Sequence, residues 1–295
     1  MYDVLELSGD GWRLGGEPWT PTKPFYAVIG DPIEHSLSPA IQNAALQERE
    51  IDTEYHPLRI TSSQLRLLKD SPLSEHLVGF NVTAPHKKAV ARLCDGRTDQ
   101  ARDLDAVNTV KVEDGKWMGH NTDSGGVLTV VSQAWQDGER PDKVIVLGAG
   151  GSGRAAIDAM LRWGVPELEV RNRSQAGQDV ARRWLSKRQK DGSSDTKITV
   201  TGLLGHDGKS LDHSSLWIGC LAGGVSLAPF LPDAAGERQA LLLDLRYGDQ
   251  RPDEFAPLGF ELIDGLPVLL MQGGLSFAWW CGPPVPWPTM REALI

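Results

Sequence analysis

The sequence predicts an α/β protein of two domains, and three observations support this prediction. From residue 25 onward, short apolar runs alternate with stretches of helical periodicity. A glycine-rich turn at 148–153 lies between one such apolar run and one such helical stretch. The 295 residues are enough for two domains of ordinary size. Alternating strands and helices typically build a parallel sheet, which binds ligands beyond the carboxyl ends of its strands.

The charge and the cysteine content exclude several classes of protein. With 39 acidic and 30 basic residues the net charge is −9, which disfavours binding to nucleic acid or to anionic membranes. No apolar run reaches the length that spans a membrane. Cys94, Cys220 and Cys281 have no C-x-x-C spacing and are expected to be reduced thiols. We therefore expect a cytoplasmic protein with neither nucleic-acid nor membrane partners.

The first part of the chain contains the alternating elements of the first predicted domain. Residues 1–24 combine several Gly and Pro with two Trp, which indicates an irregular or hairpin-like extension. Residues 25–30 form the first predicted strand, and a helix follows with Ser38 as its N-cap and Pro39 at its first position. The next predicted elements are a strand at 54–58, a helix at 62–70, a strand at 77–83 and a helix at 86–93.

Polar side chains gather where the predicted strands end. Most are neutral hydrogen-bond donors and acceptors, with one lysine and one aspartate among them. A small polyhydroxylated substrate fits this set, because a site built to bind hydroxyl groups rejects analogues that lack them. No cluster of His, Cys and carboxylate residues has the spacing of metal ligands, so we expect no metal site. The polar residues are Ser36, Ser38, Asn81, Thr83, Lys87, Asn108, Asn121 and Asp123.

Residues 143–164 carry the features of a dinucleotide-binding turn. The apolar run 144–147 predicts a buried parallel strand, and the helical pattern after it ends at Gly164. Between them, Gly148, Gly150 and Gly153 have G-x-G-x-x-G spacing. These glycines permit a tight turn, close approach of a pyrophosphate and close packing of helix on strand, and the helix N-terminus favours phosphate. This context predicts a Rossmann-type dinucleotide-binding domain.

Five motifs occur in order along the chain: Ser36-Leu-Ser38, Asn81-Val-Thr-Ala-Pro-His-Lys87, Ala106-Val-Asn-Thr109, Gly119-His-Asn-Thr-Asp-Ser-Gly-Gly126 and Gly148-Ala-Gly-Gly-Ser-Gly-Arg-Ala155. From about residue 25 to the C-terminus, their order and spacing resemble the shikimate dehydrogenase family, which includes shikimate and quinate dehydrogenases. The resemblance implies NADP-dependent, reversible reduction of 3-dehydroshikimate to shikimate, a step of aromatic amino acid biosynthesis.

The same resemblance implies a domain arrangement. An N-terminal α/β substrate-binding catalytic domain would comprise residues 1–123 with a C-terminal return at 272–295. A Rossmann-type NADP-binding domain would comprise residues 124–271, and an active-site cleft would separate the two. Two long helices would join the domains, the second of them near 272–282. A homodimer is possible.

The resemblance also assigns the catalytic and substrate-binding residues. Lys87 is expected to donate the proton in the reduction, because an unperturbed lysine with a pKa of ~10.4 is a poor base at neutral pH. Asp123 would hold Lys87 and the substrate. Lys88 is the neighbouring rival, but the motif register selects Lys87. The resemblance assigns the substrate carboxylate to Ser36 and Ser38. The remaining expected substrate contacts are Asn81, Thr83, Asn108, Tyr247 and Gln272.

The cofactor preference is predicted from the second Rossmann strand. An NAD site places an acidic residue at the end of this strand to bind the ribose hydroxyl, but this chain has Arg171-Asn-Arg-Ser174 there. Arg173 suits a 2′-phosphate, so we expect NADP, with NAD possible. Glu169 lies inside the strand, and Gly177 stands where relatives often have a second arginine. The expected cofactor contacts are Gly148, Gly150, Gly151, Ser152, Gly153, Asn172, Arg173, Ser174 and Gly265.

One segment departs from the family pattern. Relatives have an Asn-Ala-Thr-Ser-x-Gly loop beside the nicotinamide, whereas residues 219–225 here read Gly-Cys-Leu-Ala-Gly-Gly-Val. Cys220 is expected to be a small buried apolar residue and not a nucleophile. Two alternatives stay open: a paralogue acting on quinate or a related cyclitol acid, and a non-catalytic nucleotide-binding regulatory protein, of which only the second is favoured by this segment. Residues 186–197 are expected to be an exposed loop, and 283–288 a surface tail.

Overall fold

The structure of the chain is a computed structural model that describes residues 2–8, 11–70, 75–135, 140–190, 195–204, 215–221, 224–232, 240–248 and 260–295. The chain divides into two compact units, Met1–Thr122 with Gln272–Ile295, and Asp123–Met271. The chain therefore passes twice from one unit to the other.

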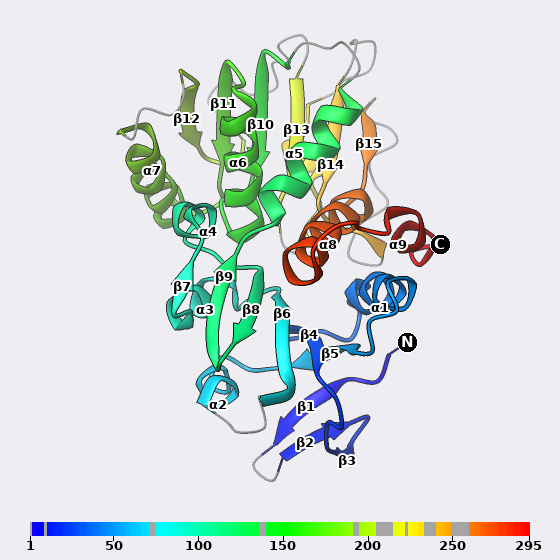
Figure 1. Cartoon of the computed structure of the whole chain (residues 1–295). Helices are drawn as coiled ribbons and strands as arrows, with labels where there is room; N and C mark the ends of the chain where they lie inside the picture. Colours follow the sequence, from blue (N-terminus) through cyan, green and yellow to red (C-terminus); the bar gives the residue numbers. More distant parts are fainter. Residues whose placement is uncertain are drawn as a thin grey trace. The chain divides into compact units, whose positions relative to one another are not determined.

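The first unit is built on a mixed sheet. Its strands are β1 (Leu5–Ser8), β2 (Gly11–Leu14), β3 (Glu17–Trp19), β4 (Phe25–Gly30), β5 (Glu54–Arg59), β6 (Leu77–Val82), β7 (Gly96–Arg97), β8 (Thr109–Glu113) and β9 (Lys116–His120). Among the described residues their order is β3-β2-β1-β5-β4-β6-β8-β9-β7 (Figure 1). β4 pairs in parallel with both β5 and β6, so the carboxyl ends of these three strands lie at one edge. Polar residues that follow these strands are thereby brought to the same side of the sheet.

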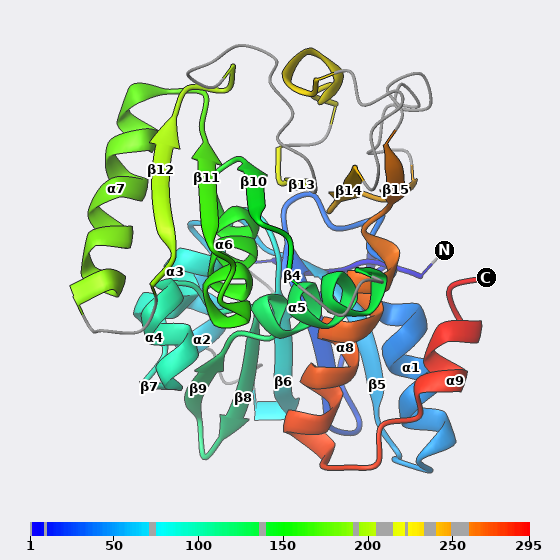
Figure 2. The same ribbon diagram turned by 90° about the horizontal axis from the view of Figure 1, so that it is seen from above.

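Six helices contribute to the described part of this unit. They are α1 (Ser38–Glu48), α2 (Leu65–Asp70), α3 (Lys87–Leu93), α4 (Asp99–Leu104), the C-terminal part of α8 (Leu266–Cys281) and α9 (Trp287–Glu292). α1 packs against α9, as Figure 2 shows. The side-chain amide of Gln42 on α1 donates a hydrogen bond of 2.9 Å to the Gly273 carbonyl on α8.

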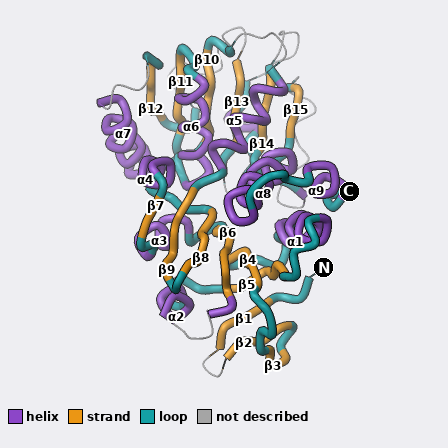
Figure 3. The backbone as a smooth tube through the Cα atoms, in the orientation of Figure 1, coloured by secondary structure: helices purple, strands orange, loops and turns teal. Residues whose placement is uncertain are grey.

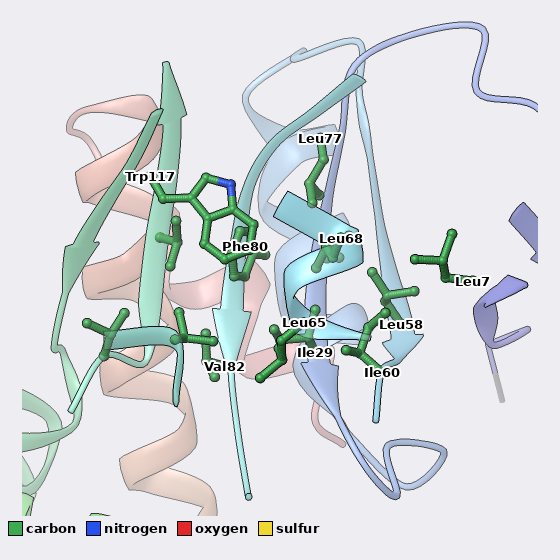
Figure 4. Close-up of a cluster of buried hydrophobic side chains, with 14 of the residues drawn as sticks. Leu7, Ile29, Leu58, Ile60, Leu65, Leu68, Leu77, Phe80, Val82 and Trp117 are labelled. Carbon is green, nitrogen blue, oxygen red and sulfur yellow. The ribbon is translucent and has the colours of Figure 1, made fainter. Parts of the chain in front are cut away.

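An apolar cluster between the sheet and its helices forms the core of the first unit. Phe80 and Trp117 lie edge to face with ring centroids 4.8 Å apart, a favourable aromatic geometry. Leu7 from the N-terminal extension and Leu58 of β5 belong to the same cluster (Figure 4). Trp12 is buried as well, and its ring lies 6.3 Å from that of Phe25. The first strands are therefore an integral part of this unit.

The second unit is built on its own sheet, whose strands are coloured orange in Figure 3. Its strands are β10 (Lys143–Leu147), β11 (Glu167–Arg171), β12 (Lys197–Thr201), β13 (Ser215–Gly219), β14 (Leu241–Asp244) and β15 (Glu261–Ile263). Every described pair is parallel, in the order β12-β11-β10-β13-β14-β15. In order along this unit the strands follow the 3-2-1-4-5-6 pattern of a Rossmann sheet. The predicted α/β fold with a Rossmann-type domain is confirmed.

Three helices and part of a fourth accompany this sheet in the described residues. They are α5 (Asp123–Ala134), α6 (Gly151–Trp163), α7 (Gln175–Lys190) and the N-terminal part of α8. α6 packs on β10 and β11 and also against α5. It ends at Gly164, whose φ of 75° lies in the left-handed region that suits a glycine cap. A short 3₁₀ turn spans Ala228–Phe230.

Several predicted elements differ from the structure. The hairpin-like extension expected at 1–24 is confirmed in its described residues, where β2 pairs antiparallel with both β1 and β3, but β1 also pairs in parallel with β5 and so joins the main sheet. These strands are too short for their alternation to stand out from the surrounding Gly and Pro. The predicted loop at 186–197 is wrong at its start, because α7 continues to Lys190; residues 191–194 lie outside the described part. The last two residues of the predicted tail at 283–288 begin a helix, α9, which packs against α1.

The start of α1 also differs from the prediction. The N-cap residue is Leu37, and Ser38 is already the first helical residue. Instead, the Ser36 hydroxyl accepts a hydrogen bond of 3.3 Å from the Ser38 N–H. Ser36 thus performs the turn-forming role that the sequence pattern suggested for Ser38, because it is Ser36 that precedes the helical backbone.

Candidate active site

The end of β6 and the start of α3 carry three predicted site residues. Asn81 lies within β6, and Thr83 follows the strand and donates its backbone N–H to the Ile29 carbonyl at 2.9 Å. Lys87 is the first residue of α3, and its carbonyl accepts from the Val107 N–H at 3.0 Å. Thr83 and Lys87 are partly exposed, whereas Asn81 is buried. The backbone bonds fix this loop at the carboxyl edge of the sheet.

The Asn81 side chain belongs to a buried polar network. Its Oδ1 accepts a hydrogen bond of 2.7 Å from the Tyr55 hydroxyl. Its Nδ2 lies 3.1 Å from the Asn108 carbonyl, 3.1 Å from Thr109 Oγ1 and 3.0 Å from Ser276 Oγ. Asn81 is 5 % exposed, so these protein groups satisfy an amide that burial would otherwise penalise.

Asn108 occupies the middle of the same network. Its Oδ1 accepts from the Thr122 backbone N–H at 2.8 Å and from Thr109 Oγ1 at 2.9 Å. Its Nδ2 donates to Thr122 Oγ1 at 2.9 Å and to Gln272 Oε1 at 3.2 Å. These partners determine which end of the Asn108 amide is the oxygen. Gln272 and Asn108, both predicted substrate contacts, are therefore hydrogen-bonded to each other.

Ser38 connects to this network through Tyr55. Ser38 is buried at the start of α1, and its side chain hydrogen-bonds with the Tyr55 phenol. Burial raises the pKa of Tyr55 well above its ordinary value, with the Ser38 hydrogen bond opposing the shift. The phenol therefore remains protonated at neutral pH. Ser36 is partly exposed one residue before the helix N-cap.

Sequence reasoning missed four members of the network. Thr109 and Thr122 lie inside the quoted motifs, beside Asn108 and Asp123, so their positions contained a usable signal. The positions of Tyr55 and Ser276 contained no such signal. Tyr55 lies in an ordinary strand pattern, and Ser276 lies in an apolar helix. Thr109 Oγ1 and Ser276 Oγ are 2.8 Å apart, and Thr122 Oγ1 and Ser276 Oγ are 3.1 Å apart.

Asp123 belongs to the second unit, where it is the first residue of α5. The next residue, Ser124, is fully buried and donates its hydroxyl proton to Asp158 Oδ2 on α6 at 2.6 Å. An acidic residue in the first turn is stabilised by the helix dipole. The predicted partner of Lys87 is thus held at a helix N-terminus.

The glycine turn after β10 has the geometry that its spacing predicts. Gly148 adopts a φ of +106°, which side chains rarely tolerate. A Cβ on Gly153 would lie 2.1 Å from the Gly148 carbonyl oxygen, whereas a Cβ on Gly150 would meet nothing within 4 Å. Gly150 is the N-cap of α6 and has no side chain that could cap the helix. Gly151 and Ser152 form the first turn of α6 beside this open space.

Two arginines near the end of β11 have different surroundings: Arg171 is the last residue of the strand, and Arg173 follows two residues later. Arg171 Nε donates to Glu169 Oε1 at 2.7 Å, and its guanidinium lies 5.0 Å from the Trp217 ring centroid. Lys143 Nζ lies 3.2 Å from the other Glu169 oxygen. Arg173 is exposed and makes no ion pair or hydrogen bond with the described residues. Glu169 is therefore neutralised within the protein, while Arg173 presents its charge to solvent.

Asn172, Ser174 and Gly177 form a compact turn next to Arg173. Asn172 Oδ1 accepts from the Ala149 N–H in the glycine turn at 3.2 Å. Ser174 Oγ accepts from the Gly177 N–H at 3.2 Å, a capping bond for α7. A Cβ on Gly177 would lie 2.0 Å from Asn172 Nδ2. A side chain at position 177 would therefore require the Asn172 amide to move.

The divergent segment lies close to the glycine turn. The Cys220 N–H donates to the Leu147 carbonyl at 2.8 Å, and a Cβ on Gly148 would lie 2.8 Å from the Cys220 carbonyl oxygen. Burial raises the pKa of the Cys220 thiol, which disfavours the thiolate. Residues 222–223 of this segment lie outside the described part.

Two further predicted residues follow β14 and β15. Tyr247 is partly buried three residues after the end of β14. Gly265 donates its N–H to the Arg246 carbonyl at 3.0 Å, and a Cβ there would lie 2.2 Å from the Leu245 carbonyl oxygen. The position therefore accepts only glycine in this backbone arrangement.

The residues that the structure describes contain no group of three or more His, Cys, Asp or Glu placed to hold a metal ion. Within these residues, no helix combines the length and the apolar character that crossing a membrane requires.

Comparisons with known proteins bear on both units. A family model described as the shikimate dehydrogenase substrate binding domain matches residues 28–110. The shikimate dehydrogenase (NADP(+)) of Microcystis aeruginosa is 34% identical, over 91% of this chain and 95% of that protein. The corresponding protein of Methanopyrus kandleri is 32% identical, over 91% of this chain and 93% of its own.

Solved structures agree. Shikimate 5-dehydrogenase from Listeria monocytogenes, in complex with shikimate and NAD, has a TM-score of 0.76 and 26% identity and covers 95% of this chain and 99% of its own. Shikimate 5-dehydrogenase from Thermus thermophilus, in complex with NADP(H) and shikimate, has a TM-score of 0.68 and 26% identity. The match covers 92% of this chain and 98% of that protein's chain. A 5-ketofructose reductase from a Gluconobacter species, at 22% identity and a TM-score of 0.72, shares the fold. The sequence relatives cover nearly the whole chain, and the protein belongs to the shikimate dehydrogenase family.

Proposed function

We propose that the protein is an NADP-dependent shikimate dehydrogenase, which reduces 3-dehydroshikimate reversibly to shikimate in aromatic amino acid biosynthesis. The observation that carries this proposal is the buried network around Asn81 and Asn108 in one unit, together with the glycine turn and Arg173 in the other. The relatives named shikimate dehydrogenase (NADP(+)) support it along nearly their full length.

The residues of the second unit fit a dinucleotide phosphate. The space above Gly150 is open, and the first turn of α6 offers backbone N–H groups to a pyrophosphate. Arg173, Asn172 and Ser174 are proposed to hold the 2′-phosphate, and Gly265 to lie beside the nicotinamide half. When bound, NADP exchanges a hydride with the substrate carbon. We assign the dinucleotide to residues 124–271 and the substrate mainly to residues 1–123 with 272–295, with Tyr247 as a further substrate contact.

NADP is the proposed preference over NAD for an electrostatic reason. The acidic residue that could bind a ribose hydroxyl, Glu169, already pairs with Arg171 and Lys143. Arg173 keeps its charge available for a phosphate because it makes no ion pair within the described residues. A shikimate 5-dehydrogenase with NAD bound is known among the structural neighbours, so NAD is proposed as a weaker alternative.

The first unit supplies donors and acceptors for a hydroxylated acid. Ser36 and Ser38 are proposed to bind the carboxylate, and Asn81, Thr83 and Asn108 to bind ring hydroxyls. Asn81 and Asn108 use much of their amide capacity within the protein, but a carbonyl oxygen has two lone pairs and can accept a second bond. Tyr247 and Gln272 are the remaining proposed contacts. The network fixes the amide rotamers before a substrate arrives, which lowers the entropy cost of binding.

Lys87 is proposed as the proton donor and orienting group for the reacting oxygen, with Asp123 as its carboxylate partner. An ammonium group gives its proton to an oxygen that gains negative charge as hydride arrives at the carbon. In the reverse direction the same group takes the proton back. A homodimer and a cytoplasmic location complete the proposal.

Replacement of Lys87 tests the proposed chemistry. In Lys87→Met, kcat for shikimate oxidation should fall by roughly a thousandfold, the range of general acid–base catalysis, while the Kd for NADP stays within about twofold. Lys88→Met is the matched control, since it removes the same charge one residue away and should keep nearly all activity. Loss of activity in Lys88→Met with survival in Lys87→Met would overturn the assignment.

A further inference from the structure

Asp158 is a buried carboxylate that the proposed chemistry does not use. It lies on α6 with 1 % exposure, between apolar neighbours that pack into the core of the second unit. Burying a carboxylate costs several kcal/mol unless charged and polar partners compensate. Two partners do so here: Ser124 of α5 donates to Oδ2 at 2.6 Å, and Arg188 of α7 pairs with Oδ1. The carboxylate therefore joins three helices.

The Ser124 hydrogen bond acts on the residue next to Asp123. Ser124 has no exposed surface, and its oxygen also accepts from Arg162 Nη1 at 3.3 Å. Hydrogen bonds to an ionised acceptor are short and roughly twice as strong as those between neutral groups. α5 begins at Asp123, so Ser124 is its second residue. The hydrogen bond from Ser124 to Asp158 therefore connects the first turn of α5 to α6 at the position next to Asp123.

Local sequence does not hold this first turn firmly. Gly125 and Gly126 follow Ser124 in the helix, and each glycine costs about 1 kcal/mol relative to alanine in a helix interior. A helix start with two glycines relies on tertiary bonds to keep one conformation. The bond to Asp158 is one of these, and it comes from the helix whose N-terminus forms the glycine turn.

We propose that Asp158 is a positioning residue that, through Ser124, fixes Asp123 relative to the cofactor-binding turn. This inference rests on the proposed function, because it concerns the geometry of hydride and proton transfer. Misplacement of reacting groups by about 1 Å can cost a hundredfold in rate without affecting ground-state binding. Loss of the hydrogen bond between Ser124 and Asp158 should therefore lower kcat and leave the affinity for NADP nearly unchanged.

The test compares variants of the full chain that differ in this one bond. Ser124→Ala should lower kcat for shikimate oxidation at least about tenfold, with KM for NADP within about twofold of wild type. Ser124→Thr keeps the hydroxyl and should restore most of kcat. Thr129→Val is the matched control: it removes another α5 hydroxyl, which donates to the Gly125 carbonyl at 2.9 Å, and should leave kcat within about twofold.

A second variant and the melting temperatures separate positioning from stability. Asp158→Asn keeps the volume but weakens the bond, so kcat should fall in the same direction by a smaller factor. Rates are measured well below the melting temperature of each variant. Unchanged kcat in a folded Ser124→Ala or Asp158→Asn protein, or an equal loss in Thr129→Val, overturns the inference alone. A wild-type protein that fails to oxidise shikimate overturns the proposed function, and this inference with it.

Discussion

The phenolic hydroxyl of Tyr55 donates a hydrogen bond of 2.7 Å to Oδ1 of Asn81. Tyr55 is 1 % exposed on β5, and Asn81 lies in β6. The bond orients the Asn81 amide so that its nitrogen faces Asn108, Thr109 and Ser276. A residue that no motif predicted therefore determines how a proposed substrate contact is presented.

Tyr55→Phe should reduce both stability and substrate affinity. The change leaves a buried Asn81 oxygen without its donor, which costs about 1–3 kcal/mol of unfolding free energy. The KM for shikimate should rise several-fold, whereas the KM for NADP should not change. Tyr26→Phe is the control, because the Tyr26 hydroxyl makes a 3.8 Å contact with Cys281 Sγ, away from the Asn81 amide. Equal effects of both variants on the KM for shikimate would contradict the role given to Tyr55.

Arg173→Ala should remove the preference for NADP. Its guanidinium is exposed at the end of β11, while the neighbouring Arg171 is already paired with Glu169. The KM for NADP should rise at least about tenfold, as expected for the loss of a charge-assisted contact worth about 1.5–3 kcal/mol, while the KM for NAD stays nearly constant. Steady-state rates with both cofactors measure this, with Arg183→Ala, an exposed arginine of α7, as control. A parallel rise in both KM values would place the phosphate elsewhere.

Gly150→Ala should impair NADP binding, whereas Gly153→Ala should lower the stability of the free protein. A Cβ on Gly150 meets open space, so the free protein should keep its melting temperature, but the added methyl group occupies the space proposed for the pyrophosphate. A Cβ on Gly153 lies 2.1 Å from the Gly148 oxygen, so this variant should be destabilised even without cofactor.

Thermal denaturation with and without NADP separates these two effects. A ligand at 100 times its Kd stabilises the native state by about 2.7 kcal/mol, and Gly150→Ala should lose most of this gain. Full stabilisation of Gly150→Ala by NADP would show that the pyrophosphate does not pass over this glycine.

Glu169→Gln should destabilise the protein in a pH-dependent way. Burial alone would raise the pKa of Glu169, but the hydrogen bonds and charges of Arg171 and Lys143 outweigh it and lower the pKa below its ordinary 4.5. Because the folded-state pKa is depressed, the stabilisation is present above the unfolded-state value and is lost as the pH falls through the folded-state value. Melting temperatures of wild type and variant should therefore differ most near pH 7 and converge as the pH falls through the depressed folded-state pKa of Glu169. A difference that is constant with pH would contradict this pairing.

The fold, and the position of most predicted site residues at the ends of strands, could be predicted from the sequence. Polar residues after β4 and β6 and the glycine turn after β10 lie at carboxyl ends because parallel pairing aligns those ends. The N-cap of α1 was assigned to the wrong residue, since the pattern Ser-x-Ser-Pro does not reveal which residue first adopts helical backbone angles. Such one-residue differences depend on local backbone geometry.

Residues that act by tertiary contact could not be predicted. Tyr55 and Ser276 reach Asn81 only because β5, β6 and α8 are brought together by folding. In the sequence, Asp158 is an ordinary polar residue of the helical pattern. Its burial and its contacts with Ser124 and Arg188 arise only when α5, α6 and α7 pack together. The three-stranded N-terminal addition likewise depends on pairing with β5.

The most direct test of the proposed function is the initial rate of nicotinamide reduction, followed by absorbance. The purified protein is offered shikimate or quinate, each with NADP and with NAD. Rapid turnover with shikimate and NADP, and much slower turnover in the other three combinations, is the predicted result. Turnover only with quinate or only with NAD would contradict the proposed specificity. No turnover in any combination, with NADP binding intact, would instead identify a non-catalytic nucleotide-binding member of the family.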